Sequence, residues 1–206
     1  YLDGIKIMYV ADPTTAEQAF QRGEAEASIE VDALNMNNLK KAGFTPYAEL
    51  TTPYMLMPDT DNPTSPFVKK EVREAVEYAI DGTAIAKAVG YGYWVGSNQI
   101  VPPSSPVYVK DLKGRPYNPA KAKELLAAAG YPNGFTTTLT ARNSTNRDSL
   151  VAVQQNLKEV GITLNLNLVT TTQFTTVTRG GWKDGLIQEF IALTSNPSWL
   201  PVAVTT

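Results

Sequence analysis

The side chains that most enzymes use for nucleophilic and acid–base chemistry are scarce in this sequence. It contains no cysteine and no histidine, which removes thiol nucleophiles, imidazole bases and the usual zinc ligands. No serine lies in a GxSxG elbow, and no histidine could activate one. Neither a GxxxxGK[ST] phosphate loop nor a GxGxxG turn occurs. We therefore expect no catalytic centre, no metal and no cofactor.

The acidic residues add no clear hydrolase signature. A retaining glycosidase needs two carboxylates about 5 Å apart on facing elements. The 20 Asp and Glu residues mostly fall on expected helix faces or in loops, where solvated charge is their ordinary role. A hydrolase with a close carboxylate pair in a pocket stays open as a third alternative, behind two kinds of binding protein described below.

Composition indicates a globular domain without an electrostatic case for nucleic acid. The chain has 206 residues, of which 43% are apolar, and its net charge is −2. No block of like charge suggests nucleic acid or an anionic membrane as a partner. No run approaches the roughly 18 apolar residues of a membrane span, and the first residues do not resemble a signal peptide. We expect residues 1–206 to form a single domain.

The clearest predicted element is a helix over residues 119–129, because residues at both of its ends are typical of helix starts and stops. Asn118 is a good N-cap residue, and Pro119 occupies the first helical position, where its missing N–H costs nothing. Gly130 follows as the residue that ends the helix. An Asn-Gly turn then predicts a strand over residues 135–140.

Strand and helix patterns alternate along the rest of the chain, as in an α/β layer. Residues 170–179 fit either a β-branched strand or a short helix, and we choose the helix. The helix that runs to residue 160 should be capped by Ser144 or Thr145. The expected sheet contains residues 5–10, 25–29, 135–140, 162–169 and 186–193, with helices 68–80 and 119–129 packed on it. Further expected elements are strands at 44–50 and 53–57 and helices at 13–22, 33–42 and 84–89.

Loops at the ends of predicted strands support binding better than catalysis. Ligands of open α/β folds bind at strand ends, on loops that a rigid sheet positions. Residues 142–146, 170–172 and 194–197 each follow a predicted strand. We expect the aromatic residues at 91–94 to pack on the surface rather than to contact a ligand.

Three segments carry a resemblance to a known family. YNPAKAKELLAAAGYPNGF at 117–135 resembles a signature segment of the solute-binding proteins of peptide-type ABC importers, called family five. Residues 65–92 resemble the paired helices of that family, and residues 1–7 resemble the strand that enters its second lobe. The resemblance implies an α/β fold of the periplasmic-binding-protein-like (type II) lobe, a mixed sheet flanked by helices. The chain is similar to a fragment that covers most of the second lobe.

The resemblance also implies a function. Such proteins are not enzymes; they work outside the cytoplasm, in the periplasm or at the cell surface, some with a lipid anchor. They capture peptides or other small solutes, close two lobes over the ligand and deliver it to the membrane permease subunits of an ABC importer. We expect a monomer with no nucleic-acid partner. The competing hypothesis is a self-contained, non-catalytic interaction domain on the same fold.

The resemblance implies a set of ligand-binding residues. Family members line the cleft with segments that match the three loops above and the strand near Tyr54, and Arg179 matches a position where an arginine can approach the ligand's carboxylate. The alternative for both arginines below is a solvated surface position, and for Trp199 core packing. The implied site residues are Tyr54, Met55, Arg142, Asn143, Ser144, Thr172, Arg179, Thr194, Ser195, Asn196 and Trp199.

The sequence departs from the peptide-binding pattern at one informative place. Many family members carry an acidic residue just before the proline-containing segment, where it holds the ligand's amino terminus. Residues 190–200 contain no carboxylate, and an aromatic residue often found near Thr172 is also missing. We therefore expect a ligand whose contact with loop 194–197 is neutral, such as an oligosaccharide, a blocked peptide or a peptide held through its backbone.

Overall fold

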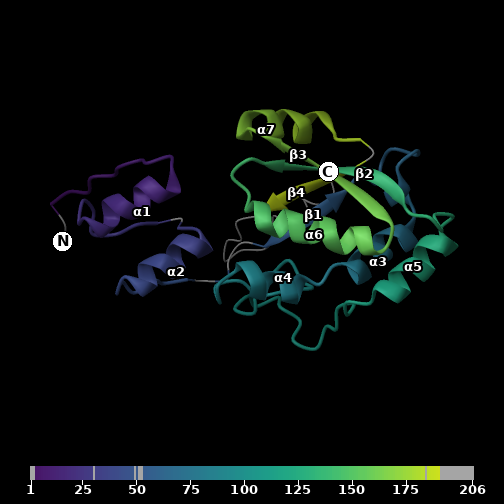
Figure 1. The fold of residues 1–206 in the computed structure, drawn as a ribbon, viewed down its shortest axis with the longest axis horizontal. Helices are drawn as coiled ribbons and strands as arrows, with labels where there is room; N and C mark the ends of the chain where they lie inside the picture. The colour runs from purple at the N-terminus through teal and green to yellow at the C-terminus, as the bar shows by residue number, and fades with distance from the viewer. Residues whose placement is uncertain (1–2, 30, 49, 51–52, 184, 191–206) are drawn as a thin grey trace.

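Within the part of the chain that the structure describes, the fold is built on one mixed four-stranded sheet (Figure 1). The computed structural model describes residues 3–29, 31–48, 50, 53–183 and 185–190. The strands lie in the order β1-β4-β2-β3; β2 runs parallel to β3 and β4, and β1 runs antiparallel to β4. The predicted mixed sheet flanked by helices is confirmed. The strands are β1 (Tyr54–Pro58), β2 (Phe135–Arg142), β3 (Ile162–Val169) and β4 (Gly185–Phe190).

Helices cover both faces of this sheet. One face carries α3 (Lys70–Ala79), α5 (Pro119–Ala128) and α6 (Arg147–Glu159), whose apolar side chains form the main core with the strands. The other face carries α7 (Thr171–Gly180), seen above the sheet in Figure 1. A 3-10 turn, Pro66–Val68, precedes α3. Helix α4 (Gly82–Val89) follows α3 in the chain.

Helix α5 has the local structure that its sequence predicts. The Asn118 side chain accepts a hydrogen bond from the backbone N–H of Lys121 at 3.0 Å, and Pro119 is the first helical residue. Leu126 is 1% exposed and lies in the main core. Gly130 has a φ of +89°, the left-handed conformation that ends helices.

The parallel pair β2 and β3 begins at a close contact between two glycines. Gly134 has a φ of +72°, and a Cβ built on it would lie 1.9 Å from the carbonyl oxygen of Gly161. Glycine is therefore required where the two strands start side by side, with Phe135 paired to Ile162.

The N-terminal residues form a small unit of their own. Helices α1 (Pro13–Gln21) and α2 (Ala33–Lys41) pack against each other, and Figure 1 shows them apart from the sheet and its helices. The Asn35 side chain donates to the carbonyl oxygen of Pro13 at 2.9 Å, and the rings of Phe20 and Phe44 lie 5.0 Å apart.

Three predicted strands do not form. Residues 5–10, 25–29 and the described part of 44–50 contain no strand, so the sheet lacks two strands that we expected in it. Ile5 and Ile7 are 79% and 86% exposed. Alternating apolar residues supply a face for burial, but a strand also needs a neighbour for its backbone hydrogen bonds. No described segment pairs with these residues.

Two smaller predictions also change. Asn146, rather than Ser144 or Thr145, caps α6 by accepting from the backbone N–H of Ser149 at 2.9 Å. Helix α4 begins at Gly82, two residues before the expected 84–89, and Asp81 rather than the nearby Thr83 caps it. Both are cases in which several capping residues lie next to one another, and propensity alone does not choose between them.

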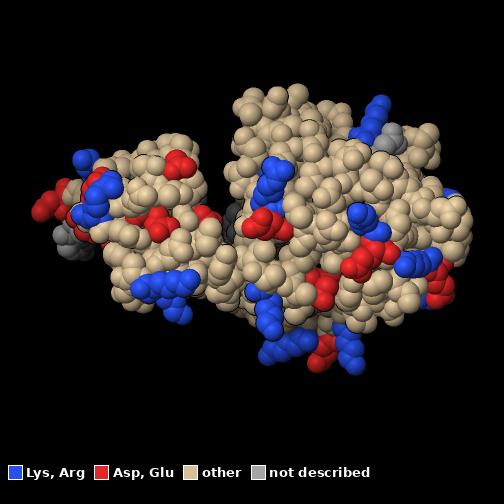
Figure 2. Space-filling model, viewed as in Figure 1, with Lys and Arg blue, Asp and Glu red and all other residues tan. Residues whose placement is uncertain are grey.

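Basic and acidic residues are nearly balanced in number, at 18 and 20. Figure 2 shows acidic and basic side chains interspersed on the face that it presents. Among the described residues, no helix has the length and apolarity needed to cross a bilayer, and no cluster of Asp and Glu could hold a metal ion.

Candidate functional site

The candidate site lies where the parallel strands end. Strands β2, β3 and β4 finish at Arg142, Val169 and Phe190, along one edge of the sheet. Strand β1 runs the other way, so its first residue, Tyr54, pairs with Phe190 at the same edge. We call this the carboxyl edge; it comprises Tyr54, residues 142–146, residues 170–172 and Phe190. It is the position at which open α/β sheets bind ligands.

The structure brings most of the described candidate residues to this edge. Arg179 is the exception: it is exposed in the last turn of α7, at the opposite end of that helix from Thr170. Thr194, Ser195, Asn196 and Trp199 lie outside the described residues. That any of the candidate residues contacts a ligand stays a prediction. The residues brought together at the edge are Tyr54, Met55, Arg142, Asn143, Ser144 and Thr172.

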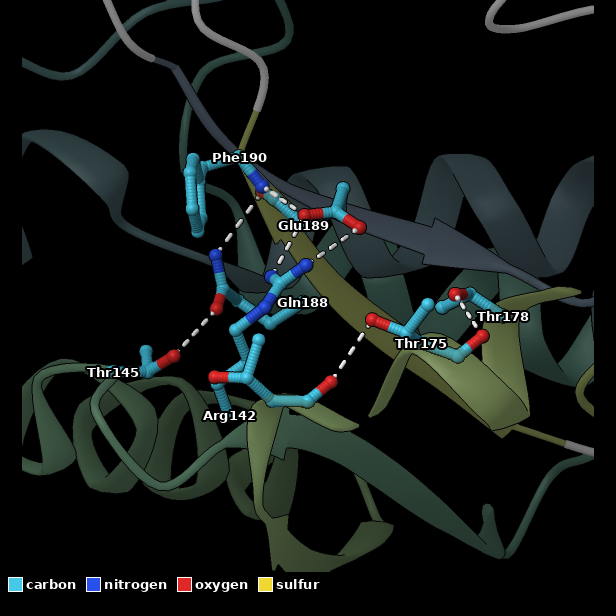
Figure 3. Close-up of polar contacts among 8 residues, drawn as sticks. Arg142, Thr145, Thr175, Thr178, Gln188, Glu189 and Phe190 are labelled. Atoms are coloured by element: carbon cyan, nitrogen blue, oxygen red, sulfur yellow. Dashed lines mark hydrogen bonds and ion pairs between the residues drawn. The ribbon is translucent and has the colours of Figure 1, made fainter. Parts of the chain in front are cut away.

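Arg142 forms a two-point ion pair with Glu189 across neighbouring strands (Figure 3). Its Nη1 and Nη2 donate to the two carboxylate oxygens at 2.8 and 3.3 Å. The side chains of Arg142 and Glu189 are 15% and 22% exposed, so the pair is largely shielded from water. This parallel arrangement is the strong form of an arginine–carboxylate contact.

Aromatic rings flank the guanidinium. The centroid of Phe174, in the first turns of α7, lies 3.9 Å from Cζ of Arg142, and the centroid of Phe190 lies 4.8 Å from it. Phe174 is fully buried, whereas Phe190 is 42% exposed. The rings and the ion pair together leave Arg142 little conformational freedom.

A hydrogen-bonded chain holds the first site loop against β4. The Thr145 hydroxyl donates to Oε1 of Gln188 at 2.8 Å, and Nε2 of Gln188 donates to the carbonyl oxygen of Glu189 at 3.1 Å (Figure 3). The backbone N–H of Asn143 donates to the carbonyl oxygen of Val169 at 2.8 Å. Asn143 and Ser144 are thereby held in place while their side chains remain exposed.

Tyr54 extends the edge with an aromatic surface. Its ring lies 5.7 Å from that of Trp94 and 6.3 Å from that of Phe190. Partial burial and the nearby Asp32 carboxylate, the N-cap of α2, raise the pKa of the Tyr54 hydroxyl. Beside Trp94, an open hollow of about 350 Å³ is lined by residues of α4 and the loop after it. Trp94 packs against other side chains, as expected for the aromatic residues at 91–94, and the ring that it contacts is that of Tyr54, a candidate site residue.

The threonine-rich helix α7 begins at the carboxyl edge. Thr170 forms a capping box with Gln173: each side chain bonds the backbone of the other. Later threonine hydroxyls donate to backbone carbonyl oxygens of the preceding turn; that of Thr175 donates to the carbonyl oxygen of Thr171 at 2.9 Å. Thr172 is exposed in the first turn, so its side chain faces solvent near the edge. The predicted helix over 170–179 is confirmed.

Sequence reasoning missed Gln188 and Glu189. The sequence predicts a strand over 186–193 without a role for its polar residues, and the expected place for a ligand-binding carboxylate, residues 190–200, begins just after Glu189. Two polar residues inside the apolar run LIQEFIAL were the available signal, because a polar group in a central strand needs a partner. The identity of that partner depends on the register of β2 and β4, which the sequence does not show.

Comparison with known proteins agrees with this architecture. Residues 1–203 match the family described as bacterial extracellular solute-binding proteins, family 5 Middle. The glutathione-binding protein GsiB of Escherichia coli (strain K12) is 37% identical over 166 residues, which cover 78% of this chain and 32% of GsiB. The chain thus spans about a third of the length of the curated relatives that it matches.

Solved structures show the same fold. The periplasmic binding protein DppA from Helicobacter pylori, in complex with peptide STSA, superposes with a TM-score of 0.80 at 24% identity, covering 91% of this chain and 37% of DppA. AgaA from A. tumefaciens R10, in complex with agropinic acid, gives a TM-score of 0.71 at 27% identity, covering 93% of this chain and 40% of AgaA. Members of the matched family are solute-binding proteins rather than enzymes. This chain belongs to the bacterial extracellular solute-binding proteins of family 5.

Proposed function

We propose that this chain forms one wall of the ligand cleft in a substrate-binding protein that captures peptides or related small solutes for an ABC importer. The observation that supports this best is the carboxyl edge itself. Exposed Asn143, Ser144 and Thr172, a shielded arginine and an aromatic surface converge there from separate segments of the chain. A few oriented polar groups beside aromatic side chains suit a small polar solute.

The names of the relatives favour a peptide-class ligand. GsiB is named for glutathione, and DppA was solved with a peptide. AgaA was solved with agropinic acid, so the same fold also serves a solute of another kind. We propose a peptide or glutathione-like solute for the full-length protein, bound through groups that are largely neutral where they meet this wall.

A single wall does not enclose a ligand, so we propose that a second lobe closes over it. Closure would exclude water and present one rigid surface to the membrane permease subunits. In this proposal the protein works as a monomer outside the cytoplasm, either free in the periplasm or attached to the cell surface. No part of the mechanism requires a covalent step.

A ligand panel tests the proposal on the full-length protein. Isothermal titration calorimetry would compare glutathione, peptide STSA and a series of dipeptides to pentapeptides with maltose and phosphate as controls. We expect saturable binding of at least one peptide-class solute with a micromolar dissociation constant or lower. A micromolar constant corresponds to a binding free energy of about −8 kcal/mol. Binding of a control solute with none to any peptide or to glutathione would overturn the proposed ligand class.

A further inference from the structure

Arg142, the cationic side chain best placed to meet a ligand at the carboxyl edge, is already paired with a carboxylate of the same chain. Arg142 ends β2 at the centre of the edge, yet Nη1 and Nη2 both donate to Glu189. Free arginines in binding clefts recognise carboxylates through the same two-point geometry. In this chain an internal carboxylate holds that position.

Several contacts keep Glu189 there. The backbone N–H of Phe190 also donates to its Oε1 at 3.0 Å, so the carboxylate accepts from the main chain as well as from Arg142. Glu189 belongs to β4, a strand paired on both sides, and therefore does not depend on a mobile loop for its position. The Phe174 ring supports the guanidinium from one side.

A ligand carboxylate would have to compete with this arrangement. The internal carboxylate is attached to a neighbouring strand, so its effective concentration at Arg142 far exceeds that of a dissolved ligand. Displacing it would also leave Glu189, whose side chain is 22% exposed, without its cationic partner. A neutral carbonyl or hydroxyl faces no such competition, because a guanidinium has five N–H donors and the pair uses two of them.

We propose that Glu189 is a selectivity-determining residue. By pairing with Arg142 it prevents the guanidinium from binding a ligand carboxylate, so that this wall favours neutral acceptors such as amide carbonyls and hydroxyls. Glu189 acts through Arg142 and is therefore a positioning residue. The inference rests on the proposed function and specifies the ligand group that the wall accepts.

The first test measures selectivity in the full-length protein. Calorimetry compares peptide STSA, which has a free carboxylate, with its C-terminal amide, and the readout is the ratio of the two dissociation constants. We expect Glu189→Gln to shift this ratio by about tenfold or more toward the free acid. Glu159→Gln, which removes an exposed carboxylate bonded to Tyr117, should leave the ratio unchanged. An unchanged ratio in Glu189→Gln would overturn the proposal.

Two further variants test whether the shift arises because Glu189 masks Arg142, that is, occupies its Nη groups, or because the substitution alters the structure. Adding Arg142→Gln to Glu189→Gln should abolish the shift, because the released guanidinium is then absent. Glu189→Asp retains the charge and should stay close to the wild-type ratio. A shift that persists in the double variant would assign the effect to altered structure and overturn masking.

A second probe does not depend on peptide binding. Sodium acetate is titrated into the ¹⁵N-labelled full-length protein while the Arg142 Nε–H resonance is followed by NMR. We expect a saturable shift in Glu189→Gln and none in the wild type. If neither a peptide nor glutathione binds but acetate distinguishes the two proteins, the proposed function fails and the masking of Arg142 by Glu189 stands. If acetate shifts both proteins equally, masking fails whatever the peptides do.

Discussion

Two charged side chains on neighbouring strands, Arg142 and Glu189, determine the chemistry of the carboxyl edge at the scale of single residues. Each satisfies the other in a largely shielded position, which makes the edge locally neutral. Arg142 could be placed at this edge from the sequence because it begins the loop that follows the strand predicted at 135–140. The role of Glu189 could not be predicted, because it depends on which strand lies beside β2, and β4 follows β2 only after an intervening strand and two helices.

The ion pair should be energetically coupled. A double-mutant cycle with Arg142→Ala and Glu189→Ala, measured by denaturant unfolding, should give a coupling of about 1–3 kcal/mol, because each single change leaves a shielded charge without its partner. The matched control is Lys121 with Glu124, whose side chains are 39% and 68% exposed. The coupling of that solvent-exposed pair should be much smaller, because water screens the two charges. Equal coupling in the two cycles would contradict the shielding of Arg142.

Tyr54 provides a prediction on pH. Its folded pKa is raised above the ordinary value of 10.0, first by burial and then by Asp32. A raised pKa favours the neutral hydroxyl, so this contribution to stability is fully present below the unfolded pKa and is lost as pH rises through the folded one. Absorbance titration of the wild type and Tyr54→Phe should show one late-titrating tyrosine that the variant lacks. Asp32→Asn should move its titration only partly back, and a Tyr54 that titrates at its ordinary pKa would contradict the packing.

At the scale of elements, local signals predicted helices better than strands. Helix α5 carries its cap and end signals in its own sequence, so it could be located without knowledge of its neighbours. Residues 170–179 also fit a β-branched strand, and the capping threonine at the start favoured the helix α7. A strand depends on a partner elsewhere in the chain. Residues 162–169 pair with β2, whereas residues 5–10, whose alternation is shorter, have no partner strand among the described residues. Periodicity identifies an apolar face and does not show what covers it.

The packing of α5 can be tested directly. Leu126 is 1% exposed within the main core, so Leu126→Ala should lower the free energy of unfolding by about 2–5 kcal/mol through the cavity that it leaves. Leu112→Ala is the matched control, because Leu112 is 51% exposed. A loss below about 0.5 kcal/mol for Leu126→Ala would place this residue on the surface and contradict the assigned helix face.

At the scale of the whole molecule, the described residues of the carboxyl edge include exposed Asn143, Ser144 and Thr172, which we propose face one side of a ligand cleft. The sheet and its helices form one body, the α1–α2 unit lies apart from it, and the chain matches about a third of its curated relatives' length. The alternation of strand and helix patterns correctly indicated an α/β fold. It did not indicate that the N-terminal residues would lie outside the sheet, because an alternating pattern does not show which strand, if any, pairs with it.

The isolated chain of 206 residues should bind ligands weakly. One wall offers part of the contacts and cannot exclude water by closing, while the cost of immobilising the ligand remains. Calorimetry with glutathione and peptide STSA should detect no submicromolar binding to this chain, in contrast to the full-length protein. Tight stoichiometric binding by the isolated chain would show that the site is complete without a second lobe.

Mapping the ligand to one edge of the sheet tests the central claim most directly. In the full-length protein, Asn143→Ala combined with Ser144→Ala changes the carboxyl edge, and Asn133→Ala changes an exposed loop residue at the opposite edge. Affinities for peptide STSA and glutathione would be measured by calorimetry. We predict at least a tenfold loss, about 1.4 kcal/mol, for the carboxyl-edge variant and a change below twofold for Asn133→Ala. Unchanged affinity in the carboxyl-edge variant, or an equal loss in both, would contradict the assignment of this edge as the ligand-binding wall.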